Sequence, residues 1–232
     1  MSTRKKTGPA RAKKERPWHH GDLLRELTAA ADALVTAGGV GSVTLRAVAS
    51  RVKPEVSHTA AMAHVGSIPD LLAYVALRWW EKLVARLVEA GASLPPHKRL
   101  VAYGLSYRDF AVANPQHFRL MYDERIWRAI NPLPRAENGA SSPAAPKGFK
   151  YAKVLYSTRN ARDEAYGLFE KAVEDGQRVG SLRLDRPAEL MARLVASLSH
   201  GLAMEGLDEG LTETEVKPLL EFAVAGMRSS SR

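Results

Sequence analysis

Apolar residues recur at helical spacing along almost the whole chain, and this pattern constrains the fold more than any other feature. After Gly21, for example, Leu23, Leu27 and Leu34 repeat every three to four residues or a multiple of that spacing. Such a period is typical of amphipathic helices that bury one face. No segment alternates apolar and polar residues for long enough to predict a strand. The pattern therefore predicts an all-α chain of about nine helices.

Glycine and small hydroxyl residues mark the expected helix ends. The first helix should end at Gly38, because glycine accepts the left-handed geometry of a helix C-terminus. Thr44 and Ser57 offer N-terminal caps for a second helix as far as Val52 and a short third helix as far as Val65. The remaining helices are expected at residues 69–89, 97–113, 115–129, 150–175, 187–205 and 212–229.

Length and composition exclude several classes of protein. A chain of 232 residues that is 45% hydrophobic can bury a sizeable core in one or two domains. It contains no cysteine, which excludes disulfide frameworks, thiolate metal sites and cysteine nucleophiles. No stretch approaches the roughly eighteen apolar residues of a membrane-spanning helix, and no signal-peptide pattern follows the basic N-terminus. We therefore expect a cytoplasmic protein that does not associate with membranes.

Positive charge is concentrated at the N-terminus. The chain carries a net charge of +9, and residues 1–20 hold seven cations against one anion. Residues 21–75, in contrast, have a net charge of −1. Basic arms of this kind often contact nucleic acid, and the alternative is a solubilising tail. The cations are Arg4, Lys5, Lys6, Arg11, Lys13, Lys14 and Arg16.

The second and third expected helices have the outline of a helix-turn-helix. The third would be about 12 Å long, close to the ~12 Å width of the DNA major groove. Hydroxyl groups at a helix N-terminus suit phosphate oxygens. The alternative is two short helices that merely pack together. The candidate DNA contacts are Thr44, Arg46, Lys53, Ser57, His58, Thr59 and His64, joined by Lys13, Lys14 and Arg16 of the arm.

Four segments resemble a known family. Residues 18–23 (WHHGDL) and 43–49 (VTLRAVA) are similar to the DNA-binding domain of tetracycline-repressor (TetR) family regulators. Residues 114–121 (NPQHFRLM) and 199–203 (SHGLA) resemble the WHG-type ligand domain of some members. The resemblance implies an Ω-shaped homodimer whose first three helices read a double-stranded DNA operator. The remaining helices would bind a small effector, and the last two would pair across a two-fold axis.

The chain also departs from the family's pattern in the reader. The turn carries two extra residues within 53–55, and the loss of family aromatics and cations removes contacts that seat the reader on DNA. These departures leave three alternatives: weaker operator binding, binding that depends on the arm, or loss of DNA binding. The substituted positions are Met62 and Val65 for Tyr and Phe, Ala63 for a basic residue, Ile68 for Lys, and Ala196 for Trp.

Bulky side chains in the C-terminal part are candidates for the effector pocket. Their spacing fits an ordinary core equally well, and His200 could be a hydrogen-bonded core histidine. The resulting organisation is a basic disordered arm at 1–17, a helix-turn-helix domain at 18–67, and a ligand-binding and dimerisation domain at 68–232. Within the last, the proline-rich residues 131–148 are expected to form a mobile loop. The candidate ligand contacts are Tyr103, Tyr107, Phe110, Phe118, Met121, Tyr122, Trp127 and His200.

Motifs of the common enzyme classes are missing from the sequence. There is no nucleophile elbow, no phosphate-binding loop followed by Lys-Ser or Lys-Thr, and no His-Glu-x-x-His. We therefore expect neither an enzyme nor a metal site, and no cofactor. The predicted function is a transcriptional regulator, a repressor released from its operator by a small molecule. The alternative is a dimeric ligand-binding or protein-interacting protein whose reader helix no longer binds DNA.

Overall fold

The computed structural model describes residues 20–53, 56–131, 133 and 152–229. The arm at 1–17, with Lys13, Lys14 and Arg16, lies outside the described residues, as does nearly all of the expected loop at 131–148.

The described residues form ten α-helices and one short 3-10 helix, without a strand, which confirms the all-α prediction. Several of the predicted bounds were wrong: the last helix ends at Ala225, four residues before the predicted 229, and the helices expected at 150–175 and 187–205 each end three residues later than predicted. The second helix ends at Ala49, three residues before Val52, and the helix expected at 115–129 is divided into two. The elements are α1 (His20–Gly38), η1 (Val40–Ser42), α2 (Leu45–Ala49), α3 (His58–Val65), α4 (Ile68–Gly91), α5 (Pro96–Ala113), α6 (Pro115–Met121), α7 (Glu124–Ile130), α8 (Ala152–Arg178), α9 (Ala188–Asp208) and α10 (Glu213–Ala225).

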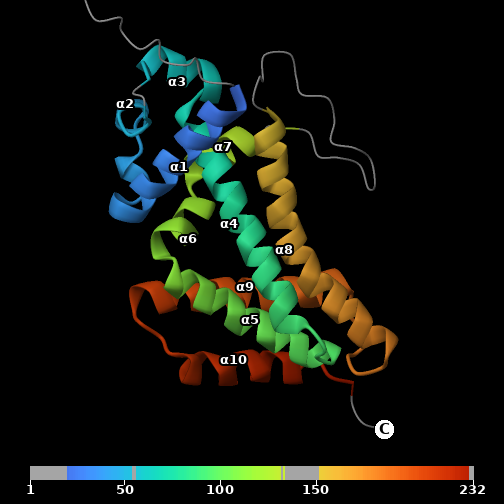
Figure 1. Cartoon of the computed structure of the whole chain (residues 1–232). Coiled ribbons are helices and arrows are strands. Elements are labelled where there is room, and N and C mark those ends of the chain that lie inside the picture. The colour runs from blue at the N-terminus through green and yellow to red at the C-terminus, as the bar shows by residue number, and fades with distance from the viewer. Residues whose placement is uncertain (1–19, 54–55, 132, 134–151, 230–232) are drawn as a thin grey trace, which may run out of the picture.

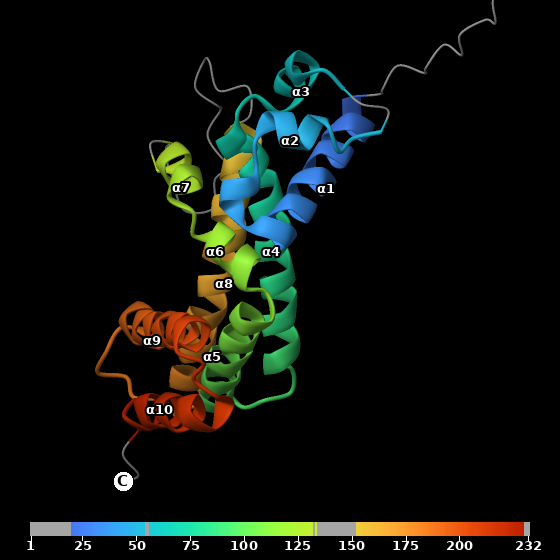
Figure 2. The same ribbon diagram turned by 90° about the vertical axis from the view of Figure 1, so that its left-hand side faces the viewer.

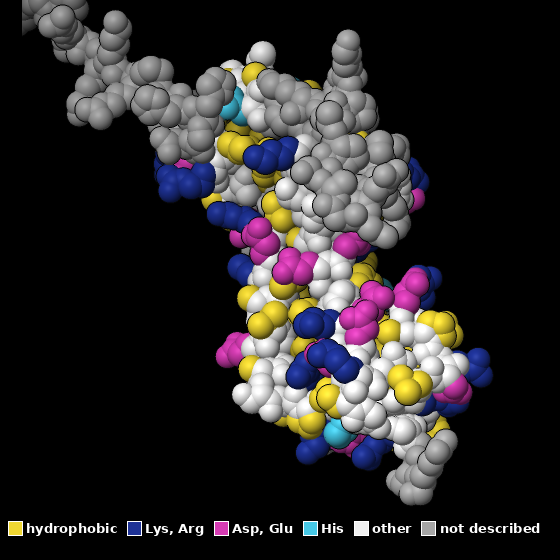
Figure 3. Space-filling model, turned by 90° about the vertical axis from the view of Figure 1, so that its right-hand side faces the viewer, with side chains coloured by type: hydrophobic (Ala, Val, Ile, Leu, Met, Phe, Trp, Pro, Cys, Tyr) yellow, Lys and Arg dark blue, Asp and Glu magenta, His cyan; other side chains and the backbone are white. Residues whose placement is uncertain are grey.

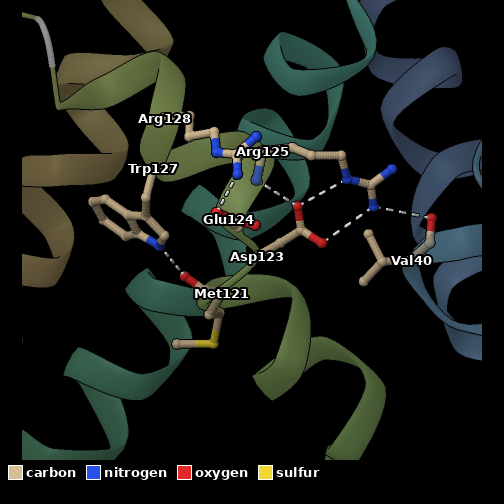
Figure 4. Close-up of polar contacts among 7 residues, drawn as sticks. All are labelled: Val40, Met121, Asp123, Glu124, Arg125, Trp127 and Arg128. Carbon is tan, nitrogen blue, oxygen red and sulfur yellow. Dashed lines mark hydrogen bonds and ion pairs between the residues drawn. The ribbon is translucent and has the colours of Figure 1, made fainter.

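A cap formed by Asp123 separates α6 from α7. Its carboxylate accepts a hydrogen bond from the backbone N–H of Arg125 at 3.0 Å, which satisfies one of the free donors at the start of α7. The Trp127 indole N–H also donates to the Met121 carbonyl at 2.9 Å, which links α7 to the end of α6 (Figure 4). The aspartate thus begins a new helix where the apolar spacing alone predicted continuation.

The helices divide the molecule into two ends joined by a central pair. α1, α2 and α3 lie at one end, whereas α5, α9 and α10 lie at the other (Figure 1). The long helices α4 and α8 run side by side between them and pack extensively. One continuous core extends from Leu23 on α1 to Met227 after α10, with Trp80 of α4 fully buried within it. The core therefore ties the two ends into one packed body.

No single helix in the described ranges is both long and apolar enough to cross a membrane. Only α3 and α4 taken together pass that test, and they are bent by 60° against each other.

Candidate nucleic-acid interface and internal aromatic cluster

Hydroxyl side chains cap α2 and α3 as the sequence predicted. The Thr44 hydroxyl accepts a hydrogen bond from the Ala47 N–H, and the Ser57 hydroxyl accepts one from the Ala60 N–H, each at 3.1 Å. Ala61 and Val65 of α3 are fully buried, so they anchor one face of this helix against the core. The opposite face of α3 is exposed to solvent, as it must be in a helix that enters the DNA major groove.

An open hollow of about 580 Å³ lies between α2 and α3. It brings together four of the predicted DNA contacts, all of them exposed: Thr44, Arg46, Ser57 and His58. A guanidinium, two hydroxyls and an imidazole can all donate hydrogen bonds to phosphate oxygens. The other described residues that line it are Ala47, Ala49, Ser50 and Val56.

The other predicted contacts surround this hollow. Thr59 is exposed on α3 and Lys53 is exposed beyond α2, whereas His64 is half-buried at the far end of α3. Met62 and Ala63 are also exposed on α3, so the outward face of this helix includes two side chains with little hydrogen-bonding capacity. Base recognition by α3 would therefore depend on its first turn.

The surface around α2 is locally cationic although residues 21–75 have a net charge of −1. Arg46, Arg51 and Lys53 are exposed and make no ion pair with another described residue. Between residues 33 and 69 the sequence contains a single acidic residue, Glu55, which lies outside the described part. On another side of the molecule, basic and acidic side chains are interspersed (Figure 3).

Two of the acidic residues that lower the net charge of residues 21–75 form contacts with other side chains. Asp32 contacts His117, and Asp70 accepts a hydrogen bond from the Ser67 hydroxyl at 2.5 Å. Sequence reasoning did not include Arg51 among the DNA contacts. Arg51 could have been recognised from its position between residues 33 and 69, a stretch that contains a single acidic residue.

Four of the predicted ligand contacts meet in the core. The Tyr107 hydroxyl hydrogen-bonds to Nδ1 of His200 at 3.1 Å and to the Tyr122 hydroxyl. The rings of Tyr122 and His200 are 4.4 Å apart, and Phe118 packs edge-on against Tyr107 at 5.4 Å. We call Tyr107, Phe118, Tyr122 and His200 the aromatic cluster. Burial raises the pKa of both tyrosines and lowers the pKa of His200, which favours the neutral form of all three polar groups.

The other predicted ligand contacts pack against other partners. Tyr103 packs against Phe169 with ring centres 5.4 Å apart, and Phe110 packs against Trp79 at 6.0 Å. Met121 is buried, and its carbonyl accepts the Trp127 N–H. The helical spacing of the aromatic residues could not distinguish these separate sites, since it specifies only the side of each helix.

A small cavity of about 10 Å³ adjoins the aromatic cluster. It is lined by Trp80, whose indole N–H is buried and makes no hydrogen bond within the described structure. Tyr166 and Ala196 line both this cavity and an open groove of about 480 Å³ between α8 and α9. A cavity of 10 Å³ is no larger than a single water molecule requires, so a larger molecule would need α8 and α9 to separate.

A polar contact joins the first helix to α6, beside the aromatic cluster. The Asp32 carboxylate on α1 lies 3.0 Å from Nε2 of His117 and accepts the Trp79 indole N–H at 2.8 Å. The Trp79 and His117 rings are stacked 3.8 Å apart, and Phe118 of the cluster follows His117 directly. Hydrogen bonding to His117 is the main reason that the pKa of Asp32 is lowered.

A second contact joins α7 to η1. The Arg125 guanidinium pairs with Asp123 at 2.9 Å and donates to the Val40 carbonyl at 3.5 Å (Figure 4). Both polar contacts connect the α1–α3 end to the short helices that flank the aromatic cluster. Sequence reasoning found neither of them, because the partners are about eighty residues apart and no local pattern marks such pairs.

Both of the last two helices, α9 and α10, carry large apolar side chains that are exposed. Leu190 and Leu194 of α9 are 55% and 57% exposed, and Phe222 of α10 is 83% exposed. Leu219 of α10 is also largely exposed. Large exposed apolar groups on neighbouring helices are typical of a protein–protein interface. We call these four residues the α9–α10 apolar face.

The chain has the fold of the TetR-family regulators. The sequence matches no protein-family model and no curated protein. Among solved structures, a protein of unknown function from Rhodococcus sp. RHA1 is 23% identical with a TM-score of 0.66, over 93% of this chain and 100% of the other. A TetR-family regulatory protein from Rhodococcus RHA1 is 17% identical with a TM-score of 0.58, over 90% and 98%. The superantigen PfiT is 15% identical with a TM-score of 0.61, over 92% and 100%.

Proposed function

We propose that this chain is a DNA-binding transcriptional regulator in which α2 and α3 contact an operator. The observation that carries the proposal is the hollow between α2 and α3, where exposed Arg46 meets the hydroxyls of Thr44 and Ser57. These groups suit the DNA backbone, whereas His58 and Thr59 on the first turn of α3 would reach base edges. The basic arm, including Lys13, Lys14 and Arg16, would add sequence-independent affinity.

The proposed assembly is a homodimer that pairs through the α9–α10 apolar face. Two-fold symmetry would present two copies of α3 to half-sites about 34–36 Å apart. The α9–α10 apolar face lies at the opposite end of the molecule from α3 (Figure 1). Small changes in how the helices between them pack would therefore change the separation of the two readers.

We further propose that a small effector opens the cavity beside the aromatic cluster and releases DNA, so that the protein acts as a repressor. The unpaired Trp80 N–H would donate to an acceptor atom of the effector. Tyr107 lines this cavity and packs against Phe118, so its displacement would move Phe118, the adjacent His117 and the contact of His117 with Asp32 on α1. By linkage, an effector that weakens DNA binding must itself bind more weakly to the DNA complex.

A gel-shift experiment with the DNA upstream of the chain's own gene tests the DNA-binding proposal. The protein should retard this duplex at low and at moderate salt. The combined replacement of Ser57, His58 and Thr59 by alanine should remove the preference for this duplex over an unrelated one. Thr214→Ala, an exposed hydroxyl change on α10, should leave it intact. Equal retardation of both duplexes by the parent protein would contradict sequence-specific regulation.

The effector proposal is tested by a thermal-shift screen of small aromatic compounds. A compound that raises the melting temperature should release DNA from the parent protein. It should have no effect on Ala196→Phe, because the added ring would occupy the space that the effector opens beside the cavity. A compound that loses its stabilising effect in Ala196→Phe, yet never affects DNA binding, would contradict the coupling.

The second candidate function is a dimeric ligand-binding or protein-interacting protein without DNA binding. Met62 and Ala63 on the outward face of α3 favour it, because neither side chain offers a strong hydrogen-bonding group. A protein described as a superantigen also has this fold, so the fold is compatible with functions other than gene regulation. Failure of every duplex to bind at low salt would select this alternative.

A further inference from the structure

A groove of about 570 Å³ lies between α5 and α10. These helices are neighbours at the end of the molecule away from α2 and α3 (Figure 2). Val101 and Leu105 of α5 and Val224 of α10 give the groove an apolar floor. Its volume falls within the range of about 300–1,000 Å³ that is usual for small-molecule sites. None of the residues lining it belongs to the aromatic cluster or to the α9–α10 apolar face.

Unpaired positive charge surrounds this floor. Lys98, Lys217 and Arg228 line the groove and are exposed, and none of their side chains hydrogen-bonds or forms an ion pair with another described residue. Among the described residues of the lining, Glu221 is the single acidic one. The groove therefore has a net positive charge and an apolar base.

His97 provides a second, independent observation. Its Nδ1 is buried at the groove and has no hydrogen-bond partner in the described structure. Buried ring nitrogens are normally hydrogen-bonded, so this one has unused capacity. Burial lowers the pKa of His97, and the positive charges of Arg228 and Lys98 lower it further, which reflects the positive potential at this site.

Two arginines of α5 outside the groove, unlike the described cations inside it, form ion pairs with aspartates. Arg99 on α5 pairs with Asp175 at 2.9 Å, and Arg108 on the same helix pairs with Asp109 at 2.8 Å. Basic residues of this helix thus pair where an acid is within reach. In the groove, charge that is unpaired beside apolar surface fits a ligand that has both an anionic group and an apolar body.

We propose that the groove between α5 and α10 binds a small organic carboxylate with an apolar body. Lys98 and Arg228 would hold the carboxylate, and the apolar body would lie on Val101, Leu105 and Val224. This site is separate from the proposed effector cavity, which lies among α4, α5, α8 and α9.

Calorimetric titration of the full-length protein with sodium octanoate tests this inference. We expect saturable binding of one octanoate per protomer. The double variant K98Q/R228Q should lower the affinity about tenfold or more, because it removes two charged hydrogen-bond donors. Lys153→Gln, an exposed lysine on α8, serves as the matched control and should bind like the parent. Octan-1-ol, which has the same body without the charge, should bind much more weakly.

Glu221→Gln tests the same groove while leaving Lys98 and Arg228 in place. Removal of the groove's acidic residue should increase the affinity for octanoate. The site would be overturned by the absence of saturable binding at millimolar octanoate, or by binding that neither K98Q/R228Q nor Glu221→Gln changes. Loss of octanoate binding in Ala196→Phe with retention in K98Q/R228Q would place the ligand in the effector cavity and would also overturn it.

Discussion

At the scale of single residues, local signals were predictable and long-range partners were not. Ser57 was identified as a cap because the hydroxyl and the N–H that it accepts are three residues apart. The partners Asp32 and His117 are separated by about eighty residues, and only the fold brings them together. Tyr107 and His200 meet for the same reason, which is why the aromatic cluster could not be separated from the rest of the core in advance.

Replacement of Asp32 by asparagine should destabilise the protein near neutral pH. The carboxylate accepts hydrogen bonds from Trp79 and His117, and its side chain is 33% exposed. Allowing for solvent screening, we expect a loss of about 1 kcal/mol in the free energy of unfolding. Urea unfolding of parent and variant measures this loss. Asp208→Asn, in a more exposed ion pair with Arg119, should cost less.

The contribution of Asp32 should also depend on pH. Its pKa in the folded protein is lowered from 3.8, so ionisation stabilises the folded state above that pH. The stabilisation should be constant above about pH 5 and decrease as the pH falls below 3.8 and through the lower folded value. The difference between parent and Asp32→Asn should therefore diminish in acid. A difference that is the same at all pH values would contradict this assignment.

At the scale of helices, most of the elements followed from apolar spacing combined with caps. α3 was predicted within a residue because Ser57 begins it and Gly66, with φ at 79°, ends it. The division between α6 and α7 was missed because the apolar period continues across it, although Asp123 is a typical N-terminal cap. How closely two helices approach was not predictable, since it depends on which small residue faces which neighbour.

Gly104 is such a contact position. A Cβ atom at this residue of α5 would lie 2.7 Å from the methyl groups of Leu220 and 2.9 Å from the Ser199 hydroxyl. Both neighbours are buried, so Gly104→Val should force α5 away from α9 and α10 and cost about 1–3 kcal/mol. Gly167→Val on α8, where a Cβ meets no atom within 4 Å, is the matched control. Chemical denaturation that finds both variants equally stable would contradict the packing described.

At the scale of the whole molecule, the proposed DNA contacts and the proposed dimer contacts lie at opposite ends. Phe222→Asp combined with Leu194→Asp should give a folded monomer, because both side chains are exposed on the α9–α10 apolar face. Val179→Asp, which alters an exposed valine that follows α8, should leave the dimer intact. Light scattering distinguishes these states. A parent mass of 25.4 kDa would contradict dimerisation.

The arm and the reader should contribute to DNA binding in different ways. Seven cations in residues 1–16 can neutralise up to seven phosphates, so the arm alone could give a log–log salt slope of roughly −6 per protomer. Arg46, Arg51 and Lys53 around α2 should add only a few units. Specificity, in contrast, should come from groove contacts of α3.

The salt dependence of binding to the upstream duplex is the decisive test of the proposed DNA binding by the arm and α3. Fluorescence anisotropy would be measured for the parent, a variant lacking residues 1–16, and the alanine replacement of Ser57, His58 and Thr59. We predict that deletion of the arm lowers the affinity and flattens the slope together, whereas the alanine variant keeps most of the slope and loses its preference for the duplex. If the parent binds no duplex even at low salt, the protein is not a DNA-binding regulator.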